Sequence, residues 1–205
     1  AGVHSGFLRF LDSFRYGMSG EIAMTRTLAK NLRVSPDWGL EVSTLSEVWQ
    51  KVPAMRTCQV DLTDCYDHKH QVLSPSDASR GLNKMTRDIA KALFTAVCRD
   101  GSVMQDELLK ATLPHSYAKA AGEMVTRDAA DALFNGLDYD LHSEEFSVEL
   151  FSEALADAGR EFVENPMGVH ALPSWLRMEH AVPEAFFRLI TAAERDPAWL
   201  QVATA

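Results

Sequence analysis

The seven residues 65–71 read CYDHKHQ and bring two histidines close to an aspartate, a tyrosine and a cysteine. His68 and His70 are one residue apart, so on an extended backbone both imidazoles would lie on one face and could bind one metal ion, with Asp67 or Cys65 as further ligands. The same composition suits a loop that contacts an organic ligand, or a solvated turn that binds nothing. Because no second pair with zinc-finger or His-Glu-x-x-His spacing occurs elsewhere, the residues alone leave all three interpretations open.

Two earlier stretches also carry groups that could hold a ligand. In PDWGLE, Glu41 falls near the first turn of an expected helix, where the helix dipole favours an ionised carboxylate that could act as a general base or accept a hydrogen bond from a hydroxyl. Trp38 beside it could stack on a sugar or anchor the core. In YGMSGE, the turn Ser19–Glu21 contains a glycine that permits close approach of a ligand to the backbone. On the residues alone, the ordinary preference for acids in first turns is favoured for Glu41 and a place in the core is favoured for Trp38, whereas a tight turn with a helix cap explains YGMSGE equally well.

The elements expected to position these groups are short within residues 1–73. We expect a helix that begins after Ser19, a second helix that begins at Ser35 and Pro36, and one strand over residues 55–62, MRTCQVDL, where apolar and polar residues alternate. CYDHKHQ would then follow the end of that strand. In α/β proteins, the carboxyl ends of strands are where ligands are usually bound.

Residues 74–205 are dominated by helical periodicity, because apolar residues recur at spacings of three and four. We expect helices over residues 74–100, 102–113, 117–137 and 143–165, then a short helix near residue 175 and a longer one that begins at Pro183. No internal repeat is present. The sequence therefore predicts an α/β fold that is strongly helix-rich, with residues 1–73 and 74–205 as its two parts.

Composition narrows the class of protein. Of the 205 residues, 46% are hydrophobic and 24% are charged, which is typical of a soluble globular protein. The net charge of −9, without a cluster of Lys and Arg, argues against nucleic-acid binding, and no apolar run approaches the roughly 20 residues that span a membrane. The three cysteines form no Cys-x-x-Cys pair and are expected to be reduced thiols in a cytoplasmic protein. The chain starts AGVHSG without an initiator Met, so we expect a fragment or a processed product.

Three stretches, taken in order, resemble the second half of one enzyme family: SFRYGMSGEIAMTR, SPDWGLEVSTLSEV, and CQVDL followed by YDHKHQ. The family comprises the retaining glycosyltransferases that make glucosyl-3-phosphoglycerate, together with the mannosyl-3-phosphoglycerate and mannosylglycerate synthases. The resemblance covers about residues 7–96, where the order and spacing of all three motifs agree. NGLDYDLHSEEFSVELF and LPSWLRMEHAVPE resemble more loosely the helical C-terminal extension of the longer members.

The resemblance implies a fold and a metal site. Residues 1–73 would form the acceptor-side half of a GT-A (nucleotide-diphospho-sugar transferase) fold, and residues 74–205 a C-terminal helical region. His68 would complete the coordination of a divalent cation, Mg²⁺ or Mn²⁺, that bridges the diphosphate of the nucleotide-sugar. His70 matches a position that contacts the glycerate acceptor in related enzymes.

The resemblance also implies roles for the two earlier motifs. Glu41 matches a carboxylate that positions the acceptor hydroxyl near the anomeric carbon. Ser19, Gly20 and Glu21 match a turn beside the acceptor and sugar pocket, and Trp38 would bind substrate next to it. Attack of the hydroxyl from the front face would retain the anomeric configuration.

The sequence departs from the family pattern in three places. Gly17 and Met18 stand where a Pro-Leu pair is usual, so this turn is expected to be more flexible. Residues 64–68 match the shorter members only after a shift of one residue, which leaves either His68 or His70 as the metal ligand. The N-terminal half of the family, with its nucleotide pocket and its Asp-x-Asp metal motif, has no counterpart in this chain.

We therefore expect part of a transferase that moves a hexose, glucose in preference to mannose, from a UDP- or GDP-sugar to 3-phosphoglycerate with retention. The chain would be inactive without its missing half, would form a homodimer, and would bind neither nucleic acid nor membrane. The alternative is a non-catalytic helical interaction or dimerisation module derived from such a transferase. A small hydrolase or metal protein built on the histidine loop would need a nucleophile, a base and an orienting acid, and no such set can be paired in the sequence.

Overall fold

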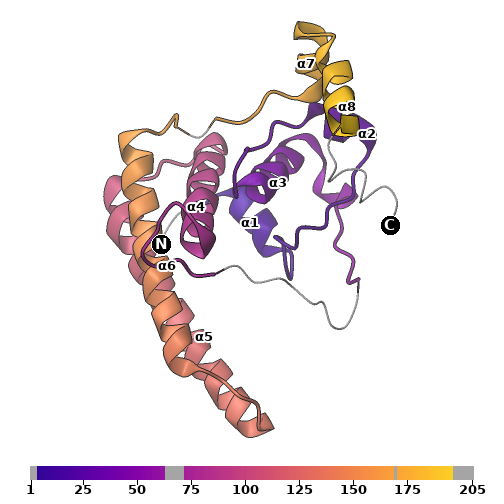
Figure 1. Ribbon diagram of the computed structural model, residues 1–205. Helices are drawn as coiled ribbons and strands as arrows, with labels where there is room; N and C mark the ends of the chain where they lie inside the picture. The colour runs from indigo at the N-terminus through magenta and orange to yellow at the C-terminus, as the bar shows by residue number, and fades with distance from the viewer. Residues whose placement is uncertain (1–3, 63–71, 169, 196–205) are drawn as a thin grey trace.

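We analysed a computed structural model of the chain, which describes residues 4–62, 72–168 and 170–195. The described residues form helices joined by turns and extended segments, and no strand is assigned among them (Figure 1). In chain order the elements are α1 (Gly6–Asp12), α2 (Arg26–Asn31), α3 (Leu40–Lys51), η1 (Ala54–Arg56), α4 (Gly81–Arg99), η2 (Leu108–Thr112), α5 (Leu113–Asn135), α6 (Leu141–Glu164), α7 (Trp175–Ala181) and α8 (Ala185–Arg195). The prediction of a strongly helix-rich protein is confirmed.

Helix α4 lies at the centre of the body and is buried on two faces. On one face, Ala92 and Ala96 pack with α1 and α3 in a cluster of small and large apolar side chains (Phe7, Phe10, Val42, Leu45 and Val48). On another face, Ala90 and Phe94 pack with η2 and α6 around Leu109, Ala158 and Phe162. Both clusters therefore depend on one helix, and the first cluster joins residues from both sides of the predicted boundary at residues 73 and 74.

One carboxylate joins α1, α3 and α4. Asp100, just after α4, accepts hydrogen bonds from Ser5 Oγ at 2.6 Å, from the backbone N–H of Phe7 at 3.1 Å and from Trp49 Nε1 at 3.3 Å. The hydrogen bond from Ser5, followed by that from Phe7, holds the pKa of Asp100 below its ordinary value. Because an ionised carboxylate is favoured at a helix N-terminus, Asp100 also complements the start of α1.

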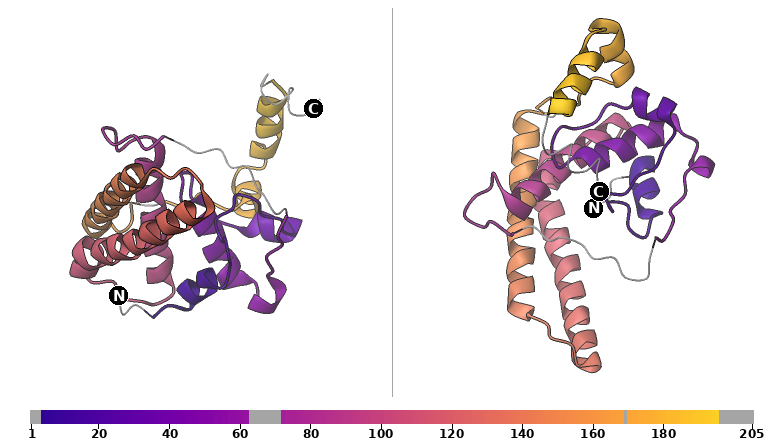
Figure 2. Two further views of the ribbon diagram at one scale, coloured as in Figure 1. Left: turned by 90° about the horizontal axis from the view of Figure 1, so that it is seen from below. Right: turned by 45° about the vertical axis from the view of Figure 1, so that its right-hand side comes forward.

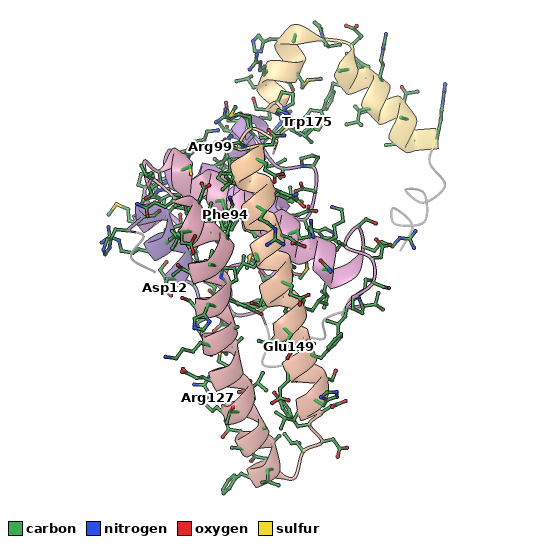
Figure 3. The ribbon with its side chains drawn as sticks, turned by 90° about the vertical axis from the view of Figure 1, so that its left-hand side faces the viewer. Asp12, Phe94, Arg99, Arg127, Glu149 and Trp175 are labelled. Atoms are coloured by element: carbon green, nitrogen blue, oxygen red, sulfur yellow. The ribbon has the colours of Figure 1, made fainter. Side chains whose placement is uncertain are left out.

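Helices α5 and α6 form an antiparallel pair that extends away from the body (Figures 1 and 2). The turn between them begins at Gly136, whose φ of +66° is the left-handed conformation that ends many helices. Figure 3 shows Phe94 in the body and Arg127 and Glu149 farther out along this pair. We call the α5–α6 pair the arm, and its outer end, around Gly136, the arm tip.

Helices α7 and α8 lie at the other end of the molecule from the arm tip (Figures 1 and 2). Helix α7 packs on α2, where Lys30 Nζ and Glu179 Oε1 are 2.6 Å apart, and the N–H of Leu172 donates to the carbonyl of Val34 at 2.8 Å. Helix α8 packs against α7. Within the described ranges, no helix is long and apolar enough to cross a membrane.

The strand predicted over residues 55–62 is not formed within the described chain. Residues Ala54–Arg56 form the short helix η1, and residues 57–62 follow without any strand assignment. A strand requires a neighbouring strand for its backbone hydrogen bonds, and none of the described segments supplies one. Val60 and Leu62 are consequently exposed.

Several predicted helix starts are also wrong, whereas the predicted ends of α4 and α6 hold. The helix expected after Ser19 begins at Arg26, the helix expected at Ser35 begins at Leu40, and the helix expected at Ser74 begins at Gly81. Helix α4 ends before Asp100, and α6 ends before Pro166, as predicted. The two helices expected over residues 102–137 are continuous, because the π-helical turn η2 runs directly into α5, with Pro114 just after their junction.

Candidate functional site

The turn Ser19–Glu21 and the start of α3 meet in space. Gly20 has a φ of +86°, which turns the chain sharply and is incompatible with the right-handed helix expected there. A Cβ atom on Gly20 would lie 3.6 Å from Glu41 Oε1. Two motifs that are about 20 residues apart in sequence therefore bring a bare backbone position against a carboxylate.

A network of hydrogen bonds holds the turn that precedes Glu41. Asp37 Oδ1 accepts hydrogen bonds from Ser35 Oγ at 2.7 Å and from the N–H of Gly39 at 2.9 Å, and the N–H of Ser35 donates to Ser43 Oγ at 2.8 Å. Helix α3 then begins at Leu40, so Glu41 lies in its first turn, as predicted. The dipole of α3 favours the ionised form of a carboxylate at this position.

Gly39 allows this turn to lie directly against α4. A Cβ atom at Gly39 would be 2.6 Å from the Cβ of Ala92 and 3.3 Å from the carbonyl oxygen of Asp88. Both neighbouring atoms belong to α4 and cannot rotate away, because one is a backbone atom and the other is bonded to the backbone. Contact with α4 therefore fixes where α3 begins, and with it the position of Glu41.

Gly39→Ala is expected to destabilise the protein by about 1–3 kcal/mol, because the added methyl group would force α3 and α4 apart. Urea unfolding measures this loss. Gly17→Ala is the matched control, because a Cβ there meets its nearest neighbour at 3.6 Å, which is ordinary contact. Equal stability of the two variants would show that the close approach at Gly39 does not constrain α3.

A buried carboxylate supports the same helix from behind. The side chain of Glu47 is 1% exposed and pairs with Arg33 at 3.1 Å and with Lys51 at 2.5 Å, and it also accepts a hydrogen bond from the N–H of Arg33. Burial alone raises the pKa of Glu47, but the hydrogen bonds from Lys51 and Arg33 and the charges of both cations outweigh burial and hold the pKa below 4.5.

Glu47 should make part of the protein's stability depend on pH. A carboxylate whose pKa is lower in the folded state contributes its full stabilisation above the unfolded pKa of about 4.5 and loses it as the pH falls through the folded pKa. Unfolding free energies measured from pH 7 to pH 3 should therefore fall more steeply for the wild type than for Glu47→Gln. Glu153→Gln, on the exposed side of α6, should follow the wild type; equal slopes for all three proteins would contradict this role.

Residues 58–62 (CQVDL), the described part of the third motif, lie beside the first motif, residues 13–26. Gln59 Oε1 accepts hydrogen bonds from the backbone N–H groups of Arg15 at 2.9 Å and Tyr16 at 3.4 Å, and Arg15 also lies 3.5 Å from Asp61. Together with the contact between Gly20 and Glu41, these bonds bring segments of all three motifs into one region.

The predicted site residues have different surroundings. Ser19 is half-buried, Gly20, Glu21 and Trp38 are exposed, and Glu41 is half-buried at the start of α3. Ser19 does not cap a helix, since Thr25 caps α2 by accepting a hydrogen bond from the N–H of Leu28 at 3.3 Å. Of these five residues, the structure brings Gly20 against Glu41, which is the half-buried carboxylate at the start of α3.

The histidine loop lies outside the described residues, so His68 and His70 remain predictions. In the part of the chain that the structure describes, no three His, Cys, Asp or Glu side chains are placed to hold one metal ion. The described residues therefore do not form a metal site by themselves. Cys58 and Cys98 are exposed free thiols.

A hollow of about 510 Å³ lies next to this region and involves residues that the sequence did not single out. Pro36 and Asp37 line one side, while Lys91, Glu161 and His170 come from the helical part of the chain. Lys91 Nζ and Glu161 Oε2 are 2.9 Å apart. Burial raises the pKa of Glu161, but hydrogen bonds from Lys91 and Arg87 outweigh burial and lower the pKa. Glu161 therefore lines the hollow as an ionised carboxylate paired with Lys91. No local sequence pattern distinguishes these residues from an ordinary helix surface.

Two curated relatives match nearly the whole chain. A protein of Persephonella marina named glucosyl-3-phosphoglycerate synthase is 47% identical over 190 residues, which is 93% of this chain and 47% of that protein. A protein of Methanococcoides burtonii with the same name is 38% identical over 197 residues, again 47% of its length. The chain thus spans about half the length of the curated relatives it matches. No protein-family model and no solved structure matches it.

Proposed function

We propose that this chain is the acceptor-binding part of a glycosyltransferase. Nearly its whole length matches about half the length of two proteins named glucosyl-3-phosphoglycerate synthase. The full enzyme would transfer glucose from a nucleotide-sugar, with UDP or GDP as its nucleotide, to 3-phosphoglycerate. The convergence of the three motifs on one region supports this proposal best, because Gln59 lies against the first motif and Gly20 lies against Glu41.

In this proposal, Glu41 orients the acceptor. Its carboxylate would accept a hydrogen bond from the attacking hydroxyl of 3-phosphoglycerate, and its position in the first turn of α3 favours the ionised form needed for that role. The hydroxyl oxygen would form the new bond to the anomeric carbon as the bond from that carbon to the diphosphate breaks, and the hydroxyl proton would pass to the oxygen of the departing diphosphate. Attack on the face that the diphosphate leaves would retain the configuration.

The neighbouring residues would bind the two substrates. Gly20 carries no side chain between the turn and Glu41, so the backbone of Ser19–Glu21 could approach the acceptor closely. Trp38 is exposed beside Glu41 and could stack on a sugar ring. His70 would contact the acceptor.

A divalent cation, Mg²⁺ or Mn²⁺, would neutralise charge on the departing diphosphate when it is bound. His68 would hold this ion, with His70 as the alternative ligand, and residues outside this chain would complete the coordination.

We further propose that residues 57–62 pair with a strand from the part of the enzyme that this chain does not span, as a GT-A fold would require. The segment is extended at Thr57 and makes no strand pairing with the described residues, and Val60 and Leu62 are exposed. Thr57 Oγ1 is buried without a hydrogen-bond partner in the described structure. Such a segment would be completed by strand addition, and the chain alone would be inactive.

A chimera tests the proposal. This chain would replace the matched segment of the Persephonella marina relative, and transfer of glucose or mannose from UDP- and GDP-sugars to 3-phosphoglycerate would be followed by mass spectrometry. Glucose transfer is expected from the chimera and not from this chain alone. A folded chimera that neither binds a nucleotide-sugar nor transfers a hexose would contradict the proposal.

The alternative function, a non-catalytic interaction or dimerisation module, has one observation in its favour. The arm tip carries large apolar side chains in solvent, as a protein-binding element does. An inactive chimera that still associates through the arm would favour this alternative. An active chimera would leave the arm as an additional feature of the enzyme.

A further inference from the structure

Residues 30–35, which we call the link, run from the end of α2 towards α3 and so connect the turn Ser19–Glu21 to Glu41. The hydrophobic cores hold little of this region, because α2 contains no buried residue and only Leu32 and Ser35 are buried within the link. A segment with few buried side chains needs other contacts to keep one conformation. The position of the turn relative to Glu41 therefore depends on the groups that hold the link.

Helix α3 supplies part of this hold. Lys51 Nζ donates to the carbonyl of Asn31 at 2.5 Å, and the side chain of Arg33 pairs with the buried Glu47 at 3.1 Å. Lys51 also pairs with Glu47, so both contacts depend on the same buried carboxylate. These two contacts use the second and fourth residues of the link, whereas the first and fifth residues contact a different part of the chain.

That part is residues 170–181, which follow α6 and include α7; we call them the C-terminal segment. Lys30 Nζ lies 2.6 Å from Glu179 Oε1, and the N–H of Leu172 donates to the carbonyl of Val34 at 2.8 Å. The side chains of Lys30 and Glu179 are only 32% and 30% exposed, so water and salt screen this ion pair less than a pair on the open surface. Figure 1 shows α7 beside α2, far from the arm tip.

The C-terminal segment and the link pass each other in opposite directions. Next to the hydrogen bond at 2.8 Å, Ala171 and Ser35 line one narrow cavity, and one residue further His170 and Pro36 line the larger hollow. Successive residues of the C-terminal segment thus follow the link in reverse order, as far as the turn that leads into α3. A contact that extends over several residues restricts the link more than a single ion pair does.

The two sides of the site would respond differently if this contact were lost. The close approach of Gly39 to α4 fixes the start of α3, so Glu41 would keep its place. The turn Ser19–Glu21 leads into α2 and would move with α2 when the link moved. The separation of Gly20 from Glu41 would therefore change while the carboxylate stayed in place.

We propose that the C-terminal segment positions the acceptor site by holding the link together with α3, with Glu179 as the positioning residue. The proposal rests on the proposed function, because it gives residues that contact no substrate a role in binding the acceptor. Since the turn would move and Glu41 would not, loss of this hold should weaken binding of 3-phosphoglycerate more than it slows the transfer step. The helical part of the chain would then contribute to acceptor binding from outside residues 1–73.

Exchange of the two charges tests the proposal in the chimera with the Persephonella marina relative. Lys30→Glu and Glu179→Lys are each expected to raise KM for 3-phosphoglycerate about 5–20-fold with kcat changed less than about threefold, and the double variant should restore KM to within about threefold of the wild type. Asp106→Lys is the matched control, because it places two lysines together as Glu179→Lys does, but in the pair with Lys110, outside the link and the C-terminal segment. Single variants with the KM of the control, or a double variant without recovery, would overturn the proposal.

Hydrogen–deuterium exchange in this chain alone separates the proposal from the proposed function. The amides of residues 19–35 should exchange at least about three times faster in Glu179→Lys, and also faster in the milder Glu179→Gln, than in the wild type, while those of α4 stay unchanged. Adding Lys30→Glu to Glu179→Lys should restore the slower exchange. Faster exchange in the variants together with an inactive wild-type chimera would contradict the proposed function but support the hold on the link. Equal exchange in all variants would overturn the proposal even if the chimera transfers glucose.

Discussion

In the chimera with the Persephonella marina relative, Glu41→Gln is expected to lower kcat for glucose transfer about 100-fold or more. Glutamine keeps the size of the side chain but removes the charge that we propose orients the acceptor hydroxyl, and loss of such positioning or base catalysis commonly costs factors of about 10²–10⁴. KM for 3-phosphoglycerate should change much less, because a neutral side chain still fills the space next to Gly20.

Glu144→Gln is the matched control for Glu41→Gln. Glu144 is also a glutamate in the first turn of a helix, but α6 holds it on the exposed arm. The two substitutions remove the same charge from the same kind of helix position. If activity depended only on the interaction of a carboxylate with a helix dipole, both variants would lose activity. A folded Glu41→Gln chimera with the activity of Glu144→Gln would show that Glu41 does not act on the acceptor.

Gly159→Ala is expected to lower the free energy of unfolding by about 1–3 kcal/mol, although alanine is normally the better helix former. Gly159 lies inside α6 where this helix crosses η2, and a Cβ atom there would be 2.5 Å from the carbonyl oxygen of Leu109 and 2.8 Å from its carbonyl carbon. These are backbone atoms, so relief of the clash requires the two helices to separate. Urea unfolding followed by circular dichroism measures the change.

The opposite sign is expected for Gly122→Ala. Gly122 lies in the interior of α5, and a Cβ atom there meets no heavy atom within 4 Å. The substitution should therefore raise the free energy of unfolding by up to about 1 kcal/mol through helix propensity alone. If both variants were stabilised, the contact between α6 and η2 would be looser than the structure places it.

The helices that the sequence predicted best are those whose signal is local and repeated. Helices α4 and α6 show apolar residues at spacings of three and four over several turns, and their ends are set by Asp100 with Gly101 and by Pro166. The start of α4 could not be predicted in the same way, because it depends on contacts with residues outside the helix. Ser74 resembles a helix cap, but Gly81 begins α4 because its φ of +57° and its contact with the carbonyl of Val72 place the chain there.

The strand expected over residues 55–62 is not formed within the described chain for a different reason. Alternation over residues 55–62 reports only which side chains would share a face, whereas a strand also needs a neighbour, and sequence pattern does not say whether the neighbour lies within the chain. In the site, the place of Glu41 in the first turn of α3 was predictable from local composition. Its proximity to Gly20 was not, because that contact depends on how the turn before α2 folds back over α3.

The double burial of α4 has a consequence for how the protein folds and opens. Ala92 and Phe94 place one helix in two separate clusters, so neither α1 and α3 nor the inner end of the arm can detach without disturbing α4. Partial unfolding from either side should stop at α4, and loss of α4 should end in cooperative collapse of the body. The arm beyond the body is free of this constraint and can fray or bend without cost to the region around Glu41.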